Sequence, residues 1–177
     1  MGYETFTRGR NHRSCCVFSA TRKSTRRSNS GQFPENSNGF PLTDSKGASV
    51  KLSDYKGRVV LLDFWGTFCE VCATEIPWFS EFQNKYKGSG LSVIGVSLDD
   101  SWKPVKPYLQ EKKVNYTVVI GNDDLARQFG VVNALPGTLL IDRNGKIADL
   151  HLGMVDKEVF EGEIRVLLKN SAKKPVR

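Results

Sequence analysis

Two cysteines separated by two residues, Cys69 and Cys72, are the side chains of this sequence best suited to covalent chemistry. They follow an apolar run, 59–65, that predicts a strand buried on both faces, and they open a segment with helical spacing, 69–86. The free amides and the dipole of a helix start stabilise negative charge, so a thiolate is favoured at Cys69. Cys72 returns to the same face one turn later and can close a reversible disulfide. We therefore predict that Cys69 attacks and Cys72 resolves.

Other uses of a cysteine pair fit the sequence less well. A structural zinc site needs four ligands, usually two such pairs, and haem attachment needs a histidine after the second cysteine, where this chain has Ala73. The remaining candidate zinc ligands have unsuitable spacings: His12, Cys15, Cys16 and His151. We predict no metal site, and we interpret His151 as a polar residue satisfied by its surroundings.

Two carboxylates lie close to the cysteines in sequence. Asp63 interrupts the apolar strand before them, where an isolated charge is costly and a raised pKa is expected. Glu75 follows Cys72 by one helical turn. Each has a simpler interpretation: Asp63 as an acceptor of hydrogen bonds from its surroundings, and Glu75 as a solvated helix residue.

The elements that must position these residues alternate between strand and helix. A hairpin around 44–47 comes first, the dipeptide Asn144-Gly145 turns the last two strands, and Asp156 is the predicted N-cap of the last helix. This order predicts an α/β fold with a mainly parallel sheet that ends in an antiparallel hairpin and has helices on both sides. The predicted strands are 40–43, 48–52, 59–65, 91–98, 116–120, 138–142 and 146–152, and the predicted helices are 69–86, 105–113, 125–129 and 156–168.

Length and composition set the domain organisation. The chain has 177 residues, 39% of them hydrophobic, which is enough for one domain with a sizeable core. Four cysteines are too few for a disulfide-rich miniprotein, and no apolar run is long enough for a transmembrane segment. We predict a disordered basic tail over 1–38, one domain over 39–170 and a disordered C-terminal tail over 171–177.

The net charge of +7 belongs mostly to the N-terminal tail. Residues 1–30 hold seven Lys or Arg and only Glu4 as an acid, so +1 remains for the rest of the chain. We therefore predict no specific nucleic-acid binding. The tail could be an organellar address, an extension without function, or a weak ligand of nucleic acid or anionic lipid. The segment 15–20 is too short and polar for a secretory signal.

The segment Phe64-Trp65-Gly66-Thr67-Phe68-Cys69-x-x-Cys72, followed by Glu75 and Pro77, resembles the active-site segment of the thioredoxin superfamily. The likeness is strongest to the TlpA/ResA-like thiol-disulfide oxidoreductases, a redoxin branch related to AhpC-TSA proteins. The segment 135–142 resembles the family's cis-proline segment, and 116–129 resembles the βα element inserted in this branch. The resemblance implies a thioredoxin-like three-layer α/β/α sandwich: a mixed central sheet with an N-terminal hairpin and that inserted element.

The resemblance also implies roles for single residues. Asp63 matches the buried acid that exchanges a proton with the resolving cysteine, and Glu75 matches the active-site glutamate of the ResA-like branch. Trp65, Leu135 and Pro136 match the segments that shield the disulfide and dock substrates, although Trp65 fits a core position equally well. Glu70 opposes the thiolate next to it, which favours a reductant.

We therefore expect an enzyme that reduces protein disulfides with no cofactor beyond its own dithiol, works with a thiol reductant partner and is a monomer. A thiol peroxidase with the same fold is one alternative, but Leu62 and Gly66 occupy the positions of its Pro and Thr. A redox-inert binding module is the other, and the intact cysteine pair argues against it. The resemblance implies the cell envelope or periplasm, while the missing signal segment leaves the cytoplasm or an organelle open.

Overall fold

Strand β3, Val59–Trp65, runs through the centre of a five-stranded sheet and ends at the cysteine pair. The computed structural model describes residues 42–170. The strands are β1 Leu42–Thr43, β2 Ser49–Val50, β3 Val59–Trp65, β4 Leu91–Ser97, β5 Thr117–Ile120, β6 Gly137–Ile141 and β7 Ile147–Leu152. The helices are α1 Cys72–Tyr86, α2 Trp102–Glu111, α3 Asp123–Gln128 and α4 Lys157–Lys169.

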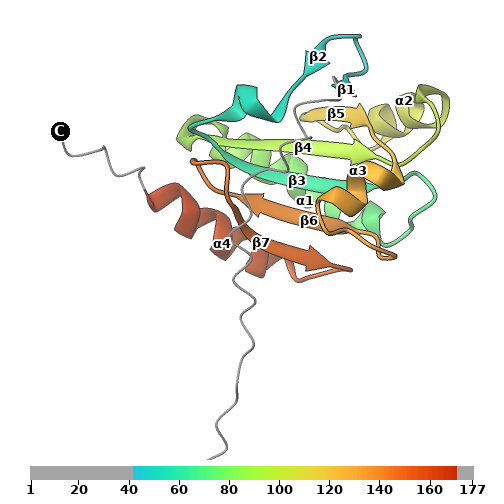
Figure 1. Ribbon diagram of the computed structural model, residues 1–177. Helices are drawn as coiled ribbons and strands as arrows, with labels where there is room; N and C mark the ends of the chain where they lie inside the picture. Colours follow the sequence, from blue (N-terminus) through green and yellow to red (C-terminus); the bar gives the residue numbers. More distant parts are fainter. Residues whose placement is uncertain (1–41, 171–177) are drawn as a thin grey trace, which may run out of the picture.

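The sheet has the mixed topology that the sequence predicted. Its strand order is β5-β4-β3-β6-β7, with β3, β4 and β5 parallel and with β6 and β7 antiparallel to their neighbours (Figure 1). In the register of the sheet, Asp63 lies between Gly95 of β4 and Thr138 of β6. The buried acid of β3 therefore has a neighbour without a side chain on one side and a hydroxyl on the other.

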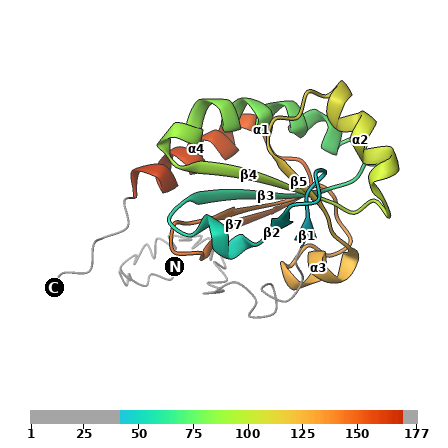
Figure 2. The ribbon, with the colours of Figure 1, turned by 90° about the horizontal axis from the view of Figure 1, so that it is seen from above.

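Helices cover both faces of the sheet, as the α/β/α prediction requires. Figure 2 shows α1, α2 and α4 on one side and α3 on the other. Alternate residues of β3 serve the two cores, because successive side chains of a strand point to opposite faces. Leu61 packs with α1 and α4, whereas Leu62 packs with α3 and the hairpin residues. The fold class predicted from the sequence is confirmed.

The N-terminal hairpin β1–β2 lies beside the outer edge of β5. Asp44 makes an isolated antiparallel bridge to Val119 of β5. The Asp44 carboxylate accepts hydrogen bonds from the amides of Lys46 and Ala48, at 2.8 and 2.9 Å, and so holds the turn. The hairpin is confirmed, although β2 is shorter than predicted; residues 40 and 41 of the first predicted strand lie outside the described residues.

Several helix ends differ from the prediction. Helix α1 begins at Cys72 rather than at residue 69, although the Cys69 carbonyl already accepts the Ala73 amide at 3.3 Å. Helix α2 begins at Trp102, three residues early, because Pro104 sits in the first turn, where no amide hydrogen is needed. Asp156 does occupy the N-cap position of α4, but its side chain makes no capping hydrogen bond.

The short helix α3 begins two residues before its predicted start. The reason is Asn122, whose side chain caps the helix by accepting the Leu125 amide at 2.8 Å. The predicted tails, 1–38 and 171–177, lie outside the described residues. Within residues 42–170, no helix has the length and apolar character needed to cross a bilayer.

Candidate active site

The two cysteines form a disulfide where β3 gives way to α1. The bond joins Cys69, in the loop, to Cys72, the first residue of the helix, with the two Cα atoms 5.3 Å apart. A buried strand fixes one end of the loop and a 15-residue helix fixes the other. The pair is thus held between two regular elements of the fold.

The two sulfurs differ in access and in surroundings. Cys72 is only 1% exposed, whereas Cys69 is half-buried. The Cys72 amide donates a hydrogen bond to the Cys69 sulfur at 3.2 Å, so that a negative charge on this sulfur has a donor in place at the helix start. A large partner can therefore reach Cys69 and not Cys72.

Asp99 holds the loop that carries Cys69, and sequence reasoning missed it. Its carboxylate accepts the Thr67 amide at 3.0 Å and the Thr67 hydroxyl at 2.5 Å. It also accepts the hydroxyl of Ser97 at 2.6 Å. Asp99 follows β4 directly, at the same sheet edge where β3 ends. A carboxylate just after a buried parallel strand was the signal that could have identified it.

Asp63 is fully enclosed on the α1 side of β3. Burial raises the pKa of its carboxyl well above the usual range, and the charge of Glu75 raises it further. Thr138 opposes this shift weakly by donating its hydroxyl to Oδ1 at 3.3 Å. The direction of this shift agrees with the raised pKa expected from the sequence.

Glu75 is also buried, with 1% of its surface exposed. Burial is the main cause that raises its pKa to about 7, and the Val155 amide, which donates to Oε1 at 3.2 Å, opposes the rise. Its other oxygen, Oε2, has no hydrogen-bond partner within residues 42–170. The interpretation of Glu75 as a solvated helix residue is therefore wrong, because the first turn of α1 faces the core.

Trp65 is a core residue next to Cys72. Its side chain has no exposed surface and packs in one cluster with Cys72 and Ile76. Gly95 makes room for it, since a Cβ atom there would lie 2.9 Å from the Trp65 ring nitrogen. The prediction that Trp65 docks substrates is not supported by this placement, because a core residue offers no surface to a partner.

The predicted docking residues Leu135 and Pro136 differ in access. The peptide bond between them is cis, as the resemblance implied, and Pro136 is buried while Leu135 is half-buried. Leu135 lines a groove of about 490 Å³. Apolar residue types predominate in its lining, together with an acid, a base and an amide, and the other lining residues are Phe68, Leu98, Asp123, Ala126, Arg127, Val131, Val132, Asn133 and Ala134.

Comparisons with known proteins agree with this geometry. The sequence model of the AhpC/TSA family matches residues 34–150. The thiol-disulfide oxidoreductase ResA of Geobacillus kaustophilus is 35% identical over 122 residues, which cover 69% of this chain and 70% of that protein. ResA of Bacillus subtilis is 30% identical over 128 residues, 72% of each chain. A crystal structure described as a putative thiol:disulfide interchange protein DsbE from Chlorobium tepidum superposes with a TM-score of 0.71 and 36% identity, covering 78% of this chain and 96% of that one.

Proposed function

This chain belongs to the AhpC/TSA family and is a thiol-disulfide oxidoreductase, and we propose that it works as a reductase of protein disulfides. The observation that carries the proposal is the contrast between the two sulfurs of one rigid pair. Cys69 is partly exposed and accepts an amide hydrogen bond, whereas Cys72 is enclosed. This arrangement suits an attacking thiolate followed by an internal resolving thiol.

In the proposed reaction the reduced pair gives two electrons to a substrate disulfide. The Cys69 thiolate attacks one substrate sulfur, so that a mixed disulfide forms, the substrate bond breaks and the departing sulfur takes up a proton. Cys72 then loses its proton and attacks the Cys69 sulfur. The internal disulfide forms as the second substrate sulfur leaves and takes up a proton. A dithiol reductant partner returns the two electrons.

Asp63 and Glu75 are the proposed proton carriers for the second step. Glu75 follows Cys72 by one turn of α1, and the two residues share a face of the helix. The charge of Glu75 raises the pKa of Asp63, so the two carboxyls hold their protons as a coupled pair. A base must be unprotonated to accept the Cys72 proton, and a pKa of about 7 at Glu75 permits this near neutral pH.

The proposed docking surface lies next to the exposed sulfur, because Phe68, which lines the groove, directly precedes Cys69. Phe68 and Val132, which are 67% and 48% exposed, border the groove that Leu135 lines. Two exposed apolar side chains at one groove offer a partner an apolar contact next to the cysteine loop. We infer that substrates place an extended apolar segment next to their disulfide here, and that Arg127 or Asp123 selects the charge at its end.

The pair of sulfurs supplies the whole redox chemistry in this proposal, so no cofactor is needed, and the protein acts as a monomer. The thiol peroxidase alternative is disfavoured, since Gly66 offers no hydroxyl next to Cys69. The redox-inert binding module is disfavoured because both cysteines are present at the junction of β3 and α1, with Cys69 partly exposed.

Trapping the mixed disulfide tests the roles of the cysteines. Cys72→Ser should accumulate a covalent complex with a disulfide-bonded protein such as insulin, because the second step is blocked, whereas Cys69→Ser should form none. A complex with Cys69→Ser alone would reverse the assignment.

The reduction potential of the cysteine pair tests whether the protein reduces or oxidises its substrates. A value near or below about −250 mV supports a reductase, and one near about −120 mV identifies an oxidant.

A further inference from the structure

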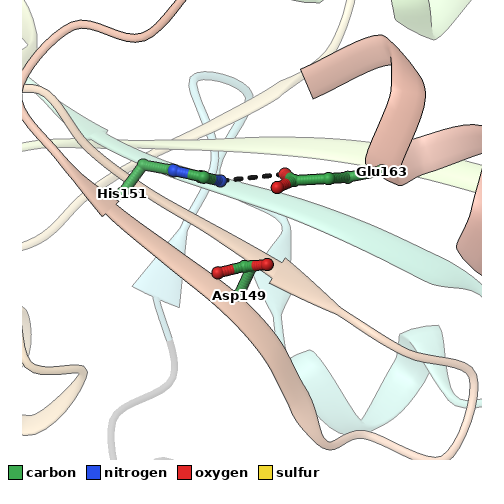
Figure 3. A group of neighbouring side chains, drawn as sticks. All are labelled: Asp149, His151 and Glu163. Carbon is green, nitrogen blue, oxygen red and sulfur yellow. Dashed lines mark hydrogen bonds and ion pairs between the residues drawn. The ribbon is translucent and has the colours of Figure 1, made fainter. Parts of the chain in front are cut away.

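A histidine and two carboxylates meet between the outer strand of the sheet and the last helix. Asp149 and His151 lie on β7, the edge strand of the order β5-β4-β3-β6-β7, and Glu163 lies on α4. One nitrogen or oxygen atom from each of the three side chains lies within 4.8 Å of the other two. Figure 3 shows His151 and Glu163 facing each other, with Asp149 beside them. None of the three residues has a role in the proposed disulfide exchange.

The local structure explains why these three side chains share one place. Asp149 and His151 are two positions apart on β7, so their side chains point to the same face of the sheet. In the register of the sheet, Asp149 pairs with Leu140 of β6, which packs in one core cluster with Phe160 of α4. Glu163 follows Phe160 by one helical turn and therefore reaches the same face. Helix α4 thus brings the second carboxylate to the two strand residues.

The imidazole of His151 is held by contacts on two sides. Its Nε2 atom lies 2.8 Å from Oε2 of Glu163, and its side chain is 15% exposed. Its ring meets the Phe160 ring edge to face, with centroids 5.2 Å apart and planes at 84°. A side chain that is already fixed in this way loses little rotamer freedom when it binds a ligand. The nitrogen that faces the carboxylate is in place to coordinate an ion.

The charges of the cluster favour a cation. In the described part of the chain, neither Asp149 nor Glu163 forms an ion pair with a Lys or Arg. Two carboxylates and one imidazole carry a net negative charge even when the imidazole is protonated, so they attract a positive ion. Glu161, two residues from Glu163 on α4, differs in this respect because it pairs with Lys85 at 2.6 Å.

The kinds of ligand atom select a class of metal. One imidazole nitrogen and two carboxylate oxygens suit Zn²⁺ and similar ions better than Mg²⁺ or Ca²⁺, which prefer oxygen ligands alone. Zinc holds such atoms at about 2.0–2.2 Å, which places neighbouring ligand atoms about 3–3.5 Å from one another. The 2.8 Å between His151 and Glu163 and the 4.8 Å limit for the cluster are close to this spacing. Small rotations of the side chains, above all of the exposed Asp149, are enough to reach it.

We propose that Asp149, His151 and Glu163 form a binding site for a divalent metal ion of the zinc class. The ligands are Nε2 of His151 and one oxygen of each carboxylate, with water completing the coordination. The imidazole binds the ion in its neutral form with no proton on Nε2, so two bonds to the ion replace the contact between His151 and Glu163. The ion joins the edge strand β7 to α4. In the sequence, His151 has no cysteine or second histidine at a suitable spacing, so the fold alone reveals this set of ligands.

A titration with zinc chloride, followed by NMR of the histidine imidazoles, tests the site directly. The full chain is used with its active-site disulfide closed and its other two cysteines alkylated, so that no thiol competes for zinc. The chain has two histidines, and His12→Asn identifies the signal of His151. This signal should move and saturate as a single site, and excess Mg²⁺ should not reverse the change. No movement up to about 1 mM Zn²⁺ would overturn the proposal.

Replacing one carboxylate at a time tests the set of ligands. Asp149→Asn and Glu163→Gln should each raise the Zn²⁺ concentration for half saturation by about tenfold or more, because each removes a charged ligand. Glu161→Gln is the matched control, since Glu161 lies on the same helix but pairs with Lys85 and Tyr86. It should bind zinc as the wild type does. Unchanged binding in both ligand variants, or equal weakening in the control, would contradict the proposed site.

Unfolding by urea gives a second measurement that does not use the imidazole signal. An ion that binds only the folded chain stabilises it by mass action, so the urea midpoint of the wild type should rise with the Zn²⁺ concentration. In His151→Gln the midpoint should stay constant, and an equal rise in the two proteins would assign the stabilisation to another site and reject this one. Neither measurement involves disulfide exchange, so the result is independent of the proposed reductase function.

Discussion

Asp99 binds Thr67 with both oxygens of its carboxylate, one to the amide at 3.0 Å and one to the hydroxyl at 2.5 Å. The two residues are 32 positions apart, at the ends of neighbouring parallel strands. Since Thr67 lies two residues before Cys69, this contact fixes the loop that presents the exposed sulfur. The geometry of the attacking thiol thus depends on a residue outside the cysteine motif.

Replacing Asp99 should therefore weaken both the fold and the reaction. In Asp99→Ala the Thr67 amide and the Ser97 hydroxyl lose their acceptor, and we expect a loss of about 1–3 kcal/mol in the free energy of unfolding. Disulfide reduction should slow as the loop loosens. Urea unfolding and an insulin assay measure the two effects. Asp100→Asn, at the exposed neighbouring position, should change neither.

The pH dependence of stability should report the burial of Glu75. Its pKa is raised in the folded state from 4.5 to about 7, so between these pH values the folded protein binds more protons than the unfolded chain. The free energy of unfolding should therefore fall as the pH rises through this window, by roughly 3 kcal/mol for this group. Urea unfolding at several pH values should show a flatter curve for Glu75→Gln. Parallel curves would contradict the raised pKa.

Asp63→Asn should slow the resolving step without unfolding the protein. The amide keeps an oxygen for the Thr138 hydroxyl but cannot accept the Cys72 proton. Proton transfer by a placed side chain is worth about 10²-fold or more, so the mixed disulfide should persist about a hundred times longer. Rapid quenching followed by gel analysis measures its lifetime. Asp54→Asn, an exposed carboxylate outside the site, is the control. An unchanged lifetime would exclude Asp63 as the proton carrier.

Glu70→Gln should make the pair more oxidising. Glu70 is exposed and adjacent to Cys69, so its charge opposes the thiolate and disfavours the reduced, ionised form. A surface charge of this kind is worth about 0.5–1 kcal/mol, which corresponds to a rise of about 10–20 mV in the reduction potential. Equilibration with glutathione buffers, followed by the fluorescence of Trp65 next to Cys72, gives the value. A fall in potential would contradict the argument.

Val132→Glu should impair protein substrates more than small ones. Val132 is 48% exposed on the wall of the groove, and a carboxylate there would face an apolar segment. We expect the KM for a protein disulfide to rise about tenfold, with the rate toward a small aromatic disulfide unchanged. Val166→Glu, on the exposed face of α4, is the matched control. Equal effects on both substrates would remove the groove from the docking surface.

The sequence predicted what depends on local spacing. The cysteine pair, the buried acid Asp63 and the order of strands and helices all follow from periodicity and from the strand-to-helix junction. The predicted starts of two helices were less accurate. Pro104 is compatible with the first turn of α2, and Asn122 caps α3 before its apolar positions begin.

Contacts between distant segments could not be predicted in the same way. The hydrogen bond from Thr67 to Asp99 depends on the register of the sheet. The contact between His151 and Glu163 depends on that register and on how α4 lies across the sheet. The placement of Trp65 depends on Gly95 in the neighbouring strand. A single sequence contains these residues but does not show which of them are in contact in the folded protein.

The unequal burial of the two sulfurs also fixes the order of events and protects the site from side reactions. Of the two active-site thiols, Cys69 alone is open to alkylating agents and hydrogen peroxide, so damage to the reduced pair should accumulate at this sulfur. The enclosed Cys72 is kept for the intramolecular step, in which it has a single target within reach. Chemical footprinting of the two thiols in the reduced protein would display this asymmetry directly.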